Sequence, residues 1–440
     1  MSNNDNKDLV NLFKQTNKWI EILNSGKTSG YPQNWTALKE VQLAHISILD
    51  DLLEKTYFPP KTYEHERGIV VGAGGAKYFG CGFACFHILR KLGCELPVEF
   101  WYLDEYEMDN NMKNICDIFG IKHVNATQYC KDHNINPRIL AGWELKPLST
   151  LYSSFKEVLY LDADNIPAKD PTYLFDLPQY RELGAIFWPD LSPHKRKEWL
   201  PAICWENVGL EYRDEVDFET GQYLINKEKC LKELNLTMWM NEHSDWFYKF
   251  VYGDKSTFHL AWRKCESKYV IPSRKAAWRH PCILQYDTNG SLVFQHACQG
   301  KELMFDGKGP TNHLNHHLIT EAKQIRDKYW SGIIYSWQEM NQQEKEYAQS
   351  IIGKYNYERV NLGSRVLELL DDGEVGEGKA KCERRWSVRI IDNVPTIIVI
   401  GAAHKDSEIA MFLAKDSGDG KSFNGRWTAF EQCQVILERL

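Results

Sequence analysis

The chain has 440 residues, 43% of them apolar, which is enough for one large domain with accessories or for two to three domains. Acidic residues (60) outnumber basic ones (53), the formal net charge is −7, and no basic tract or Lys/Arg-rich helix occurs. This composition argues against a nucleic-acid partner.

The N-terminal residues, Met1 to Asp8, are polar and lack the apolar core of a signal peptide. No stretch approaches the roughly 20 apolar residues of a membrane span. The twelve cysteines show no Cys-x-x-Cys spacing, which indicates reduced and mostly buried thiols. We therefore expect a cytoplasmic protein without a transmembrane segment.

The order of predicted elements indicates an α/β protein. Apolar positions at helical spacing predict helices within 9–23 and 38–53, the second stopped by Pro59-Pro60. From Arg67 short apolar strands alternate with helices, which predicts a largely parallel sheet with ligands at the carboxyl ends of its strands. The strands are 68–71, 98–102 and 158–161, and the helices are 78–92, 108–119 and 143–155.

The rest of the chain predicts further strands, a helical stretch and a small antiparallel unit. Strands are expected at 185–188, 221–225 and 291–295, with helices at 245–252, 257–263 and through 314–354. A charged, Gly-rich linker (371–381) precedes five short strands at 386–391, 396–400, 409–415, 425–430 and 433–437. The expected parts are a helical N-terminal extension (1–65), an α/β domain (66–310), a helical region with linker (311–375) and the antiparallel β unit (376–440).

Two carboxylates stand one residue apart where an apolar strand, 158–161, ends in Asp162-Ala163-Asp164. Side chains at i and i+2 of a strand share a face, so Asp162 and Asp164 can reach one hard cation that also holds a nucleotide diphosphate. Surface turns also collect Asp, so the triplet alone is a weak signal. We predict both aspartates as metal ligands and catalytic residues.

A glycine-rich turn follows the first strand, but it lacks the Gly-Lys-Ser/Thr ending of a P-loop and matches the dinucleotide pattern only in part. Glycine lets the backbone approach a base or ribose, although a tight strand-to-helix turn is equally consistent. The candidate cofactor-binding residues of this turn are Gly72, Ala73, Gly74 and Lys77. Lys146, near a predicted helix start, could reach the diphosphate or be a solvated surface charge.

Two more segments carry candidate site residues. Glu219 and Gln222 enter a strand and could hold sugar hydroxyls as catalytic residues, with an ordinary loop-to-strand turn as the alternative. His296 ends another strand and could complete the ligands of a manganese-like cation, or be structural. Gly300 would let the chain pass close to phosphates, and Lys301 could neutralise them.

Three further histidines, His313, His316 and His317, lack His-Glu-x-x-His spacing. We expect them to be partly exposed helix residues rather than a metal cluster.

Several segments, taken in order, resemble the fungal-type alpha-mannosyltransferases of the MNN kind. They include Gly68-Ile-Val-Val71, Trp143-Glu-Leu-Lys-Pro147, Ser154-Phe-Lys-Glu-Val-Leu-Tyr-Leu-Asp-Ala-Asp-Asn-Ile-Pro167, Gly184-Ala-Ile-Phe-Trp-Pro-Asp190, Glu219-Thr-Gly-Gln222 and Gly253-Asp-Lys-Ser-Thr-Phe258. The resemblance covers about Arg67 to Gly307. More distantly, the chain is similar to the glycogenin-like retaining transferases.

The resemblance implies a GT-A (Rossmann-like) glycosyltransferase domain, a divalent metal (Mn²⁺ or Mg²⁺), and retaining transfer from a nucleotide sugar to a glycan or glycoconjugate acceptor. GDP-mannose is the favoured donor. Asp162 and Asp164 match the Asp-x-Asp acids, and His296, Gly300 and Lys301 match the His-x(3)-Gly-Lys pattern of the distant relatives. The fungal proteins carry a Golgi membrane anchor that this sequence does not show, and the segment from about Lys379 lies outside the family pattern.

Three alternatives remain: a UDP-glucose- or UDP-galactose-dependent glycogenin-like transferase, a nucleotidyltransferase, and a non-catalytic sugar-binding protein. A nucleotidyltransferase would want a basic, glycine-rich signature after its first strand. A binding module would not need two metal-binding acids beside nucleotide-site glycines. The tryptophans of the last unit, Trp386 and Trp427, could pack in its core or hold a polysaccharide acceptor by stacking.

Overall fold

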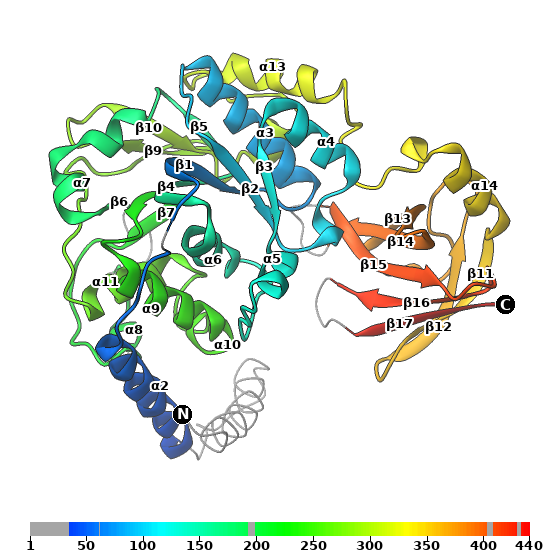
Figure 1. Ribbon diagram of the computed structural model, residues 1–440, viewed down its shortest axis with the longest axis horizontal. Coiled ribbons are helices and arrows are strands. Elements are labelled where there is room, and N and C mark those ends of the chain that lie inside the picture. Colours follow the sequence, from blue (N-terminus) through cyan, green and yellow to red (C-terminus); the bar gives the residue numbers. More distant parts are fainter. Residues whose placement is uncertain (1–34, 61, 192–198, 403–407, 429–432) are drawn as a thin grey trace.

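The structure is a computed structural model that describes residues 35–60, 62–191, 199–402, 408–428 and 433–440. Figure 1 shows an α/β domain with the seven-stranded C-terminal sheet beside it. The helix expected within 9–23 lies outside the described residues. The second expected helix is confirmed as α2 (Trp35–Glu54), and it packs against α9 (Leu231–Glu242).

The central sheet of the α/β domain has the strand order β3-β2-β1-β4-β7-β6. Its strands are β1 (His65–Gly72), β2 (Val98–Tyr102), β3 (Lys122–Asn125), β4 (Phe155–Asp162), β6 (Ala185–Pro189) and β7 (Phe218–Asn226). Strands β1 to β4 are parallel, whereas β7 runs antiparallel to β4 and β6. Strands β2 and β3 are added on one side of β1, and the chain then returns to place β4 on the other side of β1. The strand order thus reverses between β1 and β4, and ligands of such sheets bind at the carboxyl ends of the strands at this switch point.

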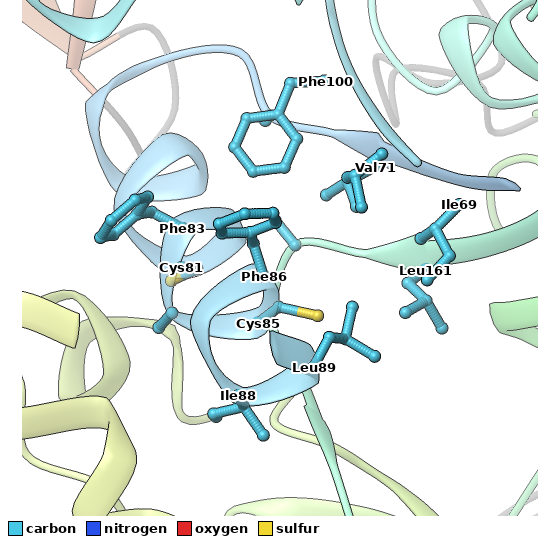
Figure 2. Packing of buried hydrophobic residues seen from close by; sticks show 14 of the residues in the cluster. Ile69, Val71, Cys81, Phe83, Cys85, Phe86, Ile88, Leu89, Phe100 and Leu161 are labelled. Carbon is cyan, nitrogen blue, oxygen red and sulfur yellow. The ribbon is translucent and has the colours of Figure 1, made fainter. Parts of the chain in front are cut away.

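Helix α3 (Ala76–Lys91) fixes this switch point by burying nearly its whole length. Figure 2 shows Phe86 and Leu89 of α3 pointing toward apolar side chains of the sheet, among them Val71 of β1 and Leu161 of β4. The helix also carries Cys81 and Cys85, and all twelve cysteines of the chain are free and mostly buried, as expected. Each Å² of apolar surface that α3 buries contributes about 25 cal/mol to the free energy of folding, so this packing stabilises the position of α3 against β1 and β4.

Most of the remaining helices belong to the α/β domain. The full set is α4 (Asn110–Phe119), α5 (Ala126–Asp132), α6 (Leu145–Tyr152), α7 (Pro178–Leu183), α8 (Ala202–Glu206), α10 (Ser244–Phe247), α11 (Lys255–Lys264), α12 (Lys301–Phe305), α13 (His316–Arg326) and α14 (Gln342–Ser350), with single turns η1 (Glu105–Glu107), η2 (Thr172–Asp176) and η3 (Trp337–Glu339). Helix α14 and the turn η3 instead pack against β13 (Glu383–Ile391) of the C-terminal sheet. The helix expected over 143–155 is shorter because residue 155 already begins β4. The helix expected over 245–252 ends at Phe247.

A second sheet shares the core of the α/β domain. Its antiparallel order is β5 (Asn165–Pro167), β10 (Leu292–His296), β9 (Cys282–Tyr286) and β8 (Ala277–Arg279). Strand β5 follows the Asp-x-Asp turn at once, and β10 pairs with it so that His296 lies opposite Asn165. The second sheet therefore brings a distant part of the chain to the end of β4.

The C-terminal sheet is antiparallel, as expected, but it begins earlier in the chain. Its order is β12 (Gly363–Leu369), β11 (Gly353–Arg359), β17 (Gln434–Arg439), β16 (Ser422–Trp427), β15 (Glu408–Asp416), β14 (Val394–Ala402) and β13 (Glu383–Ile391). Residues 353–369, which we expected in the helical region and linker, form two strands because Tyr355, Tyr357, Leu367 and Leu369 alternate inward into its core.

The expected linker over 371–381 is also wrong in part. Gly373 adopts a positive φ of 85°, and residues 374 and 375 then bridge to Arg385 and Leu369. Val375 is buried in the core of the sheet. An Asp-Asp-Gly turn, rather than a flexible linker, explains this charged stretch.

The C-terminal sheet is joined to the α/β domain by apolar packing and hydrogen bonds. Ile398, Ile400 and Ala410 belong to the same apolar cluster as α3. Strand β15 also contacts η1, and in the segment that leads to the sheet Tyr335 Oη donates to the carbonyl oxygen of Glu105 at 2.6 Å. The sheet therefore covers apolar surface of the α/β domain, which is one of the two roles considered for it.

We predict that Trp386→Ala destabilises the fold. The Trp386 side chain is fully buried, its ring lies 4.8 Å from that of Trp337, and its Nε1 donates to the carbonyl oxygen of Leu370 at 2.9 Å. Loss of a buried Trp should lower the free energy of unfolding by about 3–5 kcal/mol, measurable by urea denaturation. A sugar-stacking Trp would instead give normal stability with weaker acceptor binding. Trp427 is buried too (3% exposed), which speaks against the stacking role for both.

Two histidines, the buried His45 and the partly buried His243, link α2 to the domain. The His45 ring of α2 lies 5.1 Å from Trp246 and 5.7 Å from His243. Burial, with smaller contributions from His243 and Arg138, lowers the pKa of His45 to about 3. Burial also lowers the pKa of His243 to about 4. Both rings are therefore neutral in the folded protein at pH 6.5, the usual histidine value.

We predict that stability falls as the pH drops from 6.5 to 4. In that window the unfolded chain binds protons that the folded chain does not, so each histidine should lower the free energy of unfolding by up to about 1.4 kcal/mol per pH unit. His45→Phe should reduce this slope in urea titrations at several pH values. Changing the exposed His317 to Phe serves as the control, and equal slopes for the two variants would contradict the prediction.

Candidate functional site

Strand ends from two sheets bring acidic and basic side chains together. Gly72 and Asp162 are register partners at the carboxyl ends of β1 and β4. The amide of Ala297, just after β10, donates to the carbonyl oxygen of Asp164 at 2.9 Å. The switch point of the central sheet thus meets the end of the second sheet.

Asp162, Asp164 and His296 each direct a ligand atom toward one point. These atoms lie within 4.8 Å of one another. His296 Nε2 is 3.3 Å from Asp164 Oδ1 and 3.7 Å from Asp162 Oδ2. Asp164 and His296 are buried, whereas the Asp162 side chain is 27% exposed, so solvent reaches the cluster on the Asp162 side.

Each aspartate also pairs with a lysine. Lys146 Nζ lies 3.1 Å from Asp162 Oδ1, and Lys301 Nζ lies 2.9 Å from Asp164 Oδ2. Each carboxylate therefore has one oxygen nearest a lysine and the other facing His296, and Lys146 Nζ also lies 3.4 Å from Asp162 Oδ2. Lys146 is buried rather than solvated, and contact of either lysine with a diphosphate stays a prediction.

Glu219 orients the imidazole. Its Oε1 lies 3.1 Å from His296 Nδ1, and the same carboxylate accepts from the amide of Gly221 and from Gln222 Nε2. A Cβ at Gly221 would come within 2.4 Å of His296 Nδ1, so glycine there admits the ring. A carboxylate on Nδ1 leaves Nε2 facing the two aspartates.

The contacts of Glu219 and Gln222 favour positioning over direct chemistry. Both Glu219 oxygens are engaged within the protein. Gln222 is fully buried, and its Oε1 meets no hydrogen-bond donor among the described residues. Their predicted contact with sugar hydroxyls is not tested by this arrangement.

The charges of the cluster shift one another strongly. Burial alone would raise the pKa of Glu219, but His296 and the Gly221 amide hold that pKa at about 2. Burial would lower the pKa of His296, yet Asp164 and Glu219 raise it well above its usual range. His296 and Lys301 likewise hold the pKa of Asp164 well below that of an ordinary carboxyl group, against the effect of burial. The carboxylates of Glu219 and Asp164 are thus ionised at neutral pH.

The donor set fits a divalent cation. Two carboxylates and one imidazole are the ligand types that suit Mn²⁺, and oxygen ligands suit Mg²⁺. The Glu219–His296 contact is the outer-shell interaction that usually orients a metal-bound histidine. Asp162, Asp164 and His296 would hold the ion, as we predicted from the sequence.

The glycine turn packs against its own chain. A Cβ at Gly74 would lie 2.0 Å from Glu107 Oε2, and one at Gly72 would lie 2.9 Å from Tyr160 Oη. The amide of Gly75 donates to the carbonyl oxygen of Glu107 at 2.7 Å. These contacts favour the tight strand-to-helix turn, and approach of a nucleotide to Gly72, Ala73 or Gly74 stays a prediction.

Two other predicted cofactor-binding residues also have partners within the chain. Lys77 Nζ lies 3.1 Å from Glu302 Oε1. Gly300 precedes α12, and a Cβ there would lie 2.9 Å from the ring of Pro281. Gly300 therefore lets the chain pass close to Pro281. Lys77 pairs with Glu302 in the first turn of α12.

The structure adds Asp254, which was quoted in the resemblance but not selected as a site residue. Its Oδ2 lies 3.3 Å from Lys146 Nζ and accepts from Thr220 Oγ1 at 3.0 Å. Its side chain is buried just before α11. The Gly253-Asp-Lys segment of the resemblance was the signal that could have identified it.

Outside this cluster, the described part of the chain offers no second group of three possible metal ligands within reach of one another. His313 instead contacts the carbonyl oxygen of Arg279 at 3.0 Å and is buried, so our expectation of exposure was wrong for this residue. Of the described helices, none combines the length and apolar character needed to span a membrane.

Comparison with known proteins identifies relatives of the α/β domain. The family described as "Mannosyltransferase putative" matches residues 66–208 and 210–289, about half of the chain. Alpha-1,2-mannosyltransferase MNN24 of Candida albicans is 30% identical over 280 residues, covering 53% of this chain and 38% of that protein. Alpha-1,2-mannosyltransferase MNN2 of Saccharomyces cerevisiae is 27% identical over 297 residues, covering 58% and 47%. The chain thus spans less than half the length of these two relatives.

Solved structures give weaker likenesses. An active-site mutant of LgtC is 15% identical with a TM-score of 0.38, covering 58% of this chain and 95% of that one. The mannosyltransferase Ktr4p of S. cerevisiae, solved with GDP, is 11% identical with a TM-score of 0.31, covering 57% and 83%.

We predict that Glu219→Ala weakens cation binding at the cluster. Loss of the carboxylate frees the His296 ring to rotate, and removal of such outer-shell partners typically costs about 10–100-fold in metal affinity. Calorimetric titration with MnCl₂ measures this. Glu321→Ala, which removes a carboxylate from the buried His87 of α3, is the matched control. Equal manganese affinity of both variants would exclude the positioning role of Glu219.

Proposed function

Because the chain belongs to this mannosyltransferase family, we propose that it transfers mannose from a nucleotide sugar to a hydroxyl group of a glycan, with a divalent cation as cofactor. The observation that carries the proposal is the cluster of Asp162, Asp164 and His296 at the switch point of the central sheet. Ligands of α/β sheets bind at such points, and paired carboxylates there suit a metal-bridged diphosphate.

The cation, when bound, would stabilise the negative charge that develops on the departing nucleoside diphosphate. The protein contributes fixed positive charge nearby through Lys301 and Lys146, each held by an aspartate. Buried contacts hold the two lysines in place before the substrate binds. The protein therefore needs little rearrangement of its charged groups during the reaction. The geometry supports leaving-group stabilisation as the main contribution of the site.

We further propose retention of configuration. The acceptor hydroxyl oxygen bonds to the anomeric carbon on the face from which the phosphate oxygen leaves, and the hydroxyl proton passes to that phosphate. Glu219 is engaged by His296, Gly221 and Gln222, so its contacts do not favour it as a covalent nucleophile. The Oε1 atom of Gln222 is an acceptor suited to a sugar hydroxyl.

GDP-mannose is our proposed donor, as the resemblance to the MNN kind implies. A UDP-sugar-dependent transferase would use the same acids and cation, and differs in its base pocket. Guanine and uracil differ in size and hydrogen-bond pattern, so such a pocket should discriminate strongly between them. A nucleotidyltransferase is the remaining enzyme alternative, and it would release pyrophosphate.

We predict that GDP-mannose is consumed faster than UDP-glucose or UDP-galactose in the presence of MnCl₂, and that EDTA stops the reaction. Asp164→Asn keeps the size of the side chain but removes a charge from the cluster, so turnover should fall by about 100-fold or more. Release of GDP and of UDP is measured with each donor.

Asp176→Asn is the control, because Asp176 pairs with Arg67 and Arg181 away from the cluster. Faster use of UDP-glucose would overturn the mannose assignment. Full turnover of the Asp164 variant at limiting manganese would overturn the metal role. Pyrophosphate release from GTP and mannose 1-phosphate, tested in a separate reaction, would favour a nucleotidyltransferase.

A further inference from the structure

Two large aromatic side chains lie exposed and in contact on the α/β domain. Trp143 is 52% exposed and Tyr252 is 77% exposed. Their ring centroids are 5.7 Å apart at an interplanar angle of 45°. Exposed apolar groups of this size, placed side by side, are unfavourable in water unless a ligand covers them.

The pair is built by the backbone rather than left by chance on a loose loop. Gly253 has a positive φ of 68°, and a Cβ there would lie 2.7 Å from Trp143 Cε3. The Trp143 ring therefore lies directly against the Gly253 backbone. Tyr248 supports the ring from another side, at 5.9 Å between centroids. Its hydroxyl is itself anchored to Asn241 Oδ1.

Both rings belong to segments that enter the metal cluster within a few residues. The carbonyl oxygen of Trp143 accepts from the amide of Lys146, and Tyr252 precedes Asp254 by two residues. Lys146 Nζ bridges Asp254 Oδ2 and Asp162 Oδ1 at 3.3 and 3.1 Å. The aromatic pair is thus connected to the Asp-x-Asp turn through a single buried lysine.

We propose that Trp143 and Tyr252 bind a sugar ring of the acceptor glycan by stacking. The proposal rests on the proposed glycosyl transfer and names the acceptor as an oligosaccharide, because the rings do not belong to the cluster but precede Lys146 and Asp254 by only three and two residues in the chain. The apolar faces of a pyranose ring pack on aromatic rings, while its hydroxyl groups stay in water. The sugar that stacks is therefore a neighbour of the one whose hydroxyl group reacts.

The test compares acceptor kinetics of Tyr252→Ala and Trp143→Ala with the wild-type protein. A mannose trisaccharide and free mannose serve as acceptors at saturating donor. The KM for the trisaccharide should rise about tenfold in each variant, whereas kcat at saturating acceptor and the affinity for the donor, measured by calorimetry, should not change. Tyr252→Phe, which keeps the ring, should restore the KM.

Phe58→Ala removes another exposed aromatic side chain and is the matched control, with wild-type kinetics expected. An unchanged trisaccharide KM in Tyr252→Ala would overturn the stacking role, as would equal KM values of the wild-type protein for the two acceptors. Sedimentation analysis tests the alternative that the two rings form a contact between copies of the chain. Loss of self-association in a variant whose trisaccharide KM is unchanged would also overturn the stacking role. Failure of the wild-type protein to consume any nucleotide sugar would instead refute the underlying transferase function.

Discussion

The structure depends on one electrostatic constraint, the balance of charges where Asp162 and Asp164 face His296. Each aspartate has one oxygen against a lysine, Lys146 or Lys301, and the other toward the imidazole. Glu219 and Asp254 add two more carboxylates to the same contacts. Buried charges are tolerated only when they are paired, so the elements that carry these seven groups must keep their relative positions.

The fold meets this constraint by joining segments that are distant in sequence. Strand β4 supplies Asp162, the turn after it supplies Asp164, β7 supplies Glu219, and β10 supplies His296. The β5–β10 pairing fixes the histidine against the Asp-x-Asp turn, and α3 holds β1 and β4 together from one face of the sheet (Figure 2). The site is therefore a property of two sheets and a buried helix rather than of one loop.

The sequence predicted those parts whose signal is local. Apolar runs located β1, β2 and β4, and the Asp-x-Asp spacing located the two aspartates that the structure brings to His296. Strand β3, Lys-His-Val-Asn, is too polar to be recognised and forms because β2 offers it a paired edge. Strands β11 and β12 were hidden by a helical assignment of the region before them, although Tyr355 and Tyr357 alternate as in a strand. The resemblance pointed to the segment of Asp254, but the contact of Asp254 with Lys146 could not be predicted because only the folded chain brings the two residues together.

The strand order of the C-terminal sheet has a consequence for the way the chain folds. Strand β17 is last in sequence, yet it lies between β11 and β16 and pairs with both. During synthesis, strands β11–β12 and β13–β16 can each form a hairpin or meander, but their two halves stay unjoined until β17 leaves the ribosome. Closure of that sheet is thus a late, long-range event, and until then its exposed edges are open to pairing with other nascent chains.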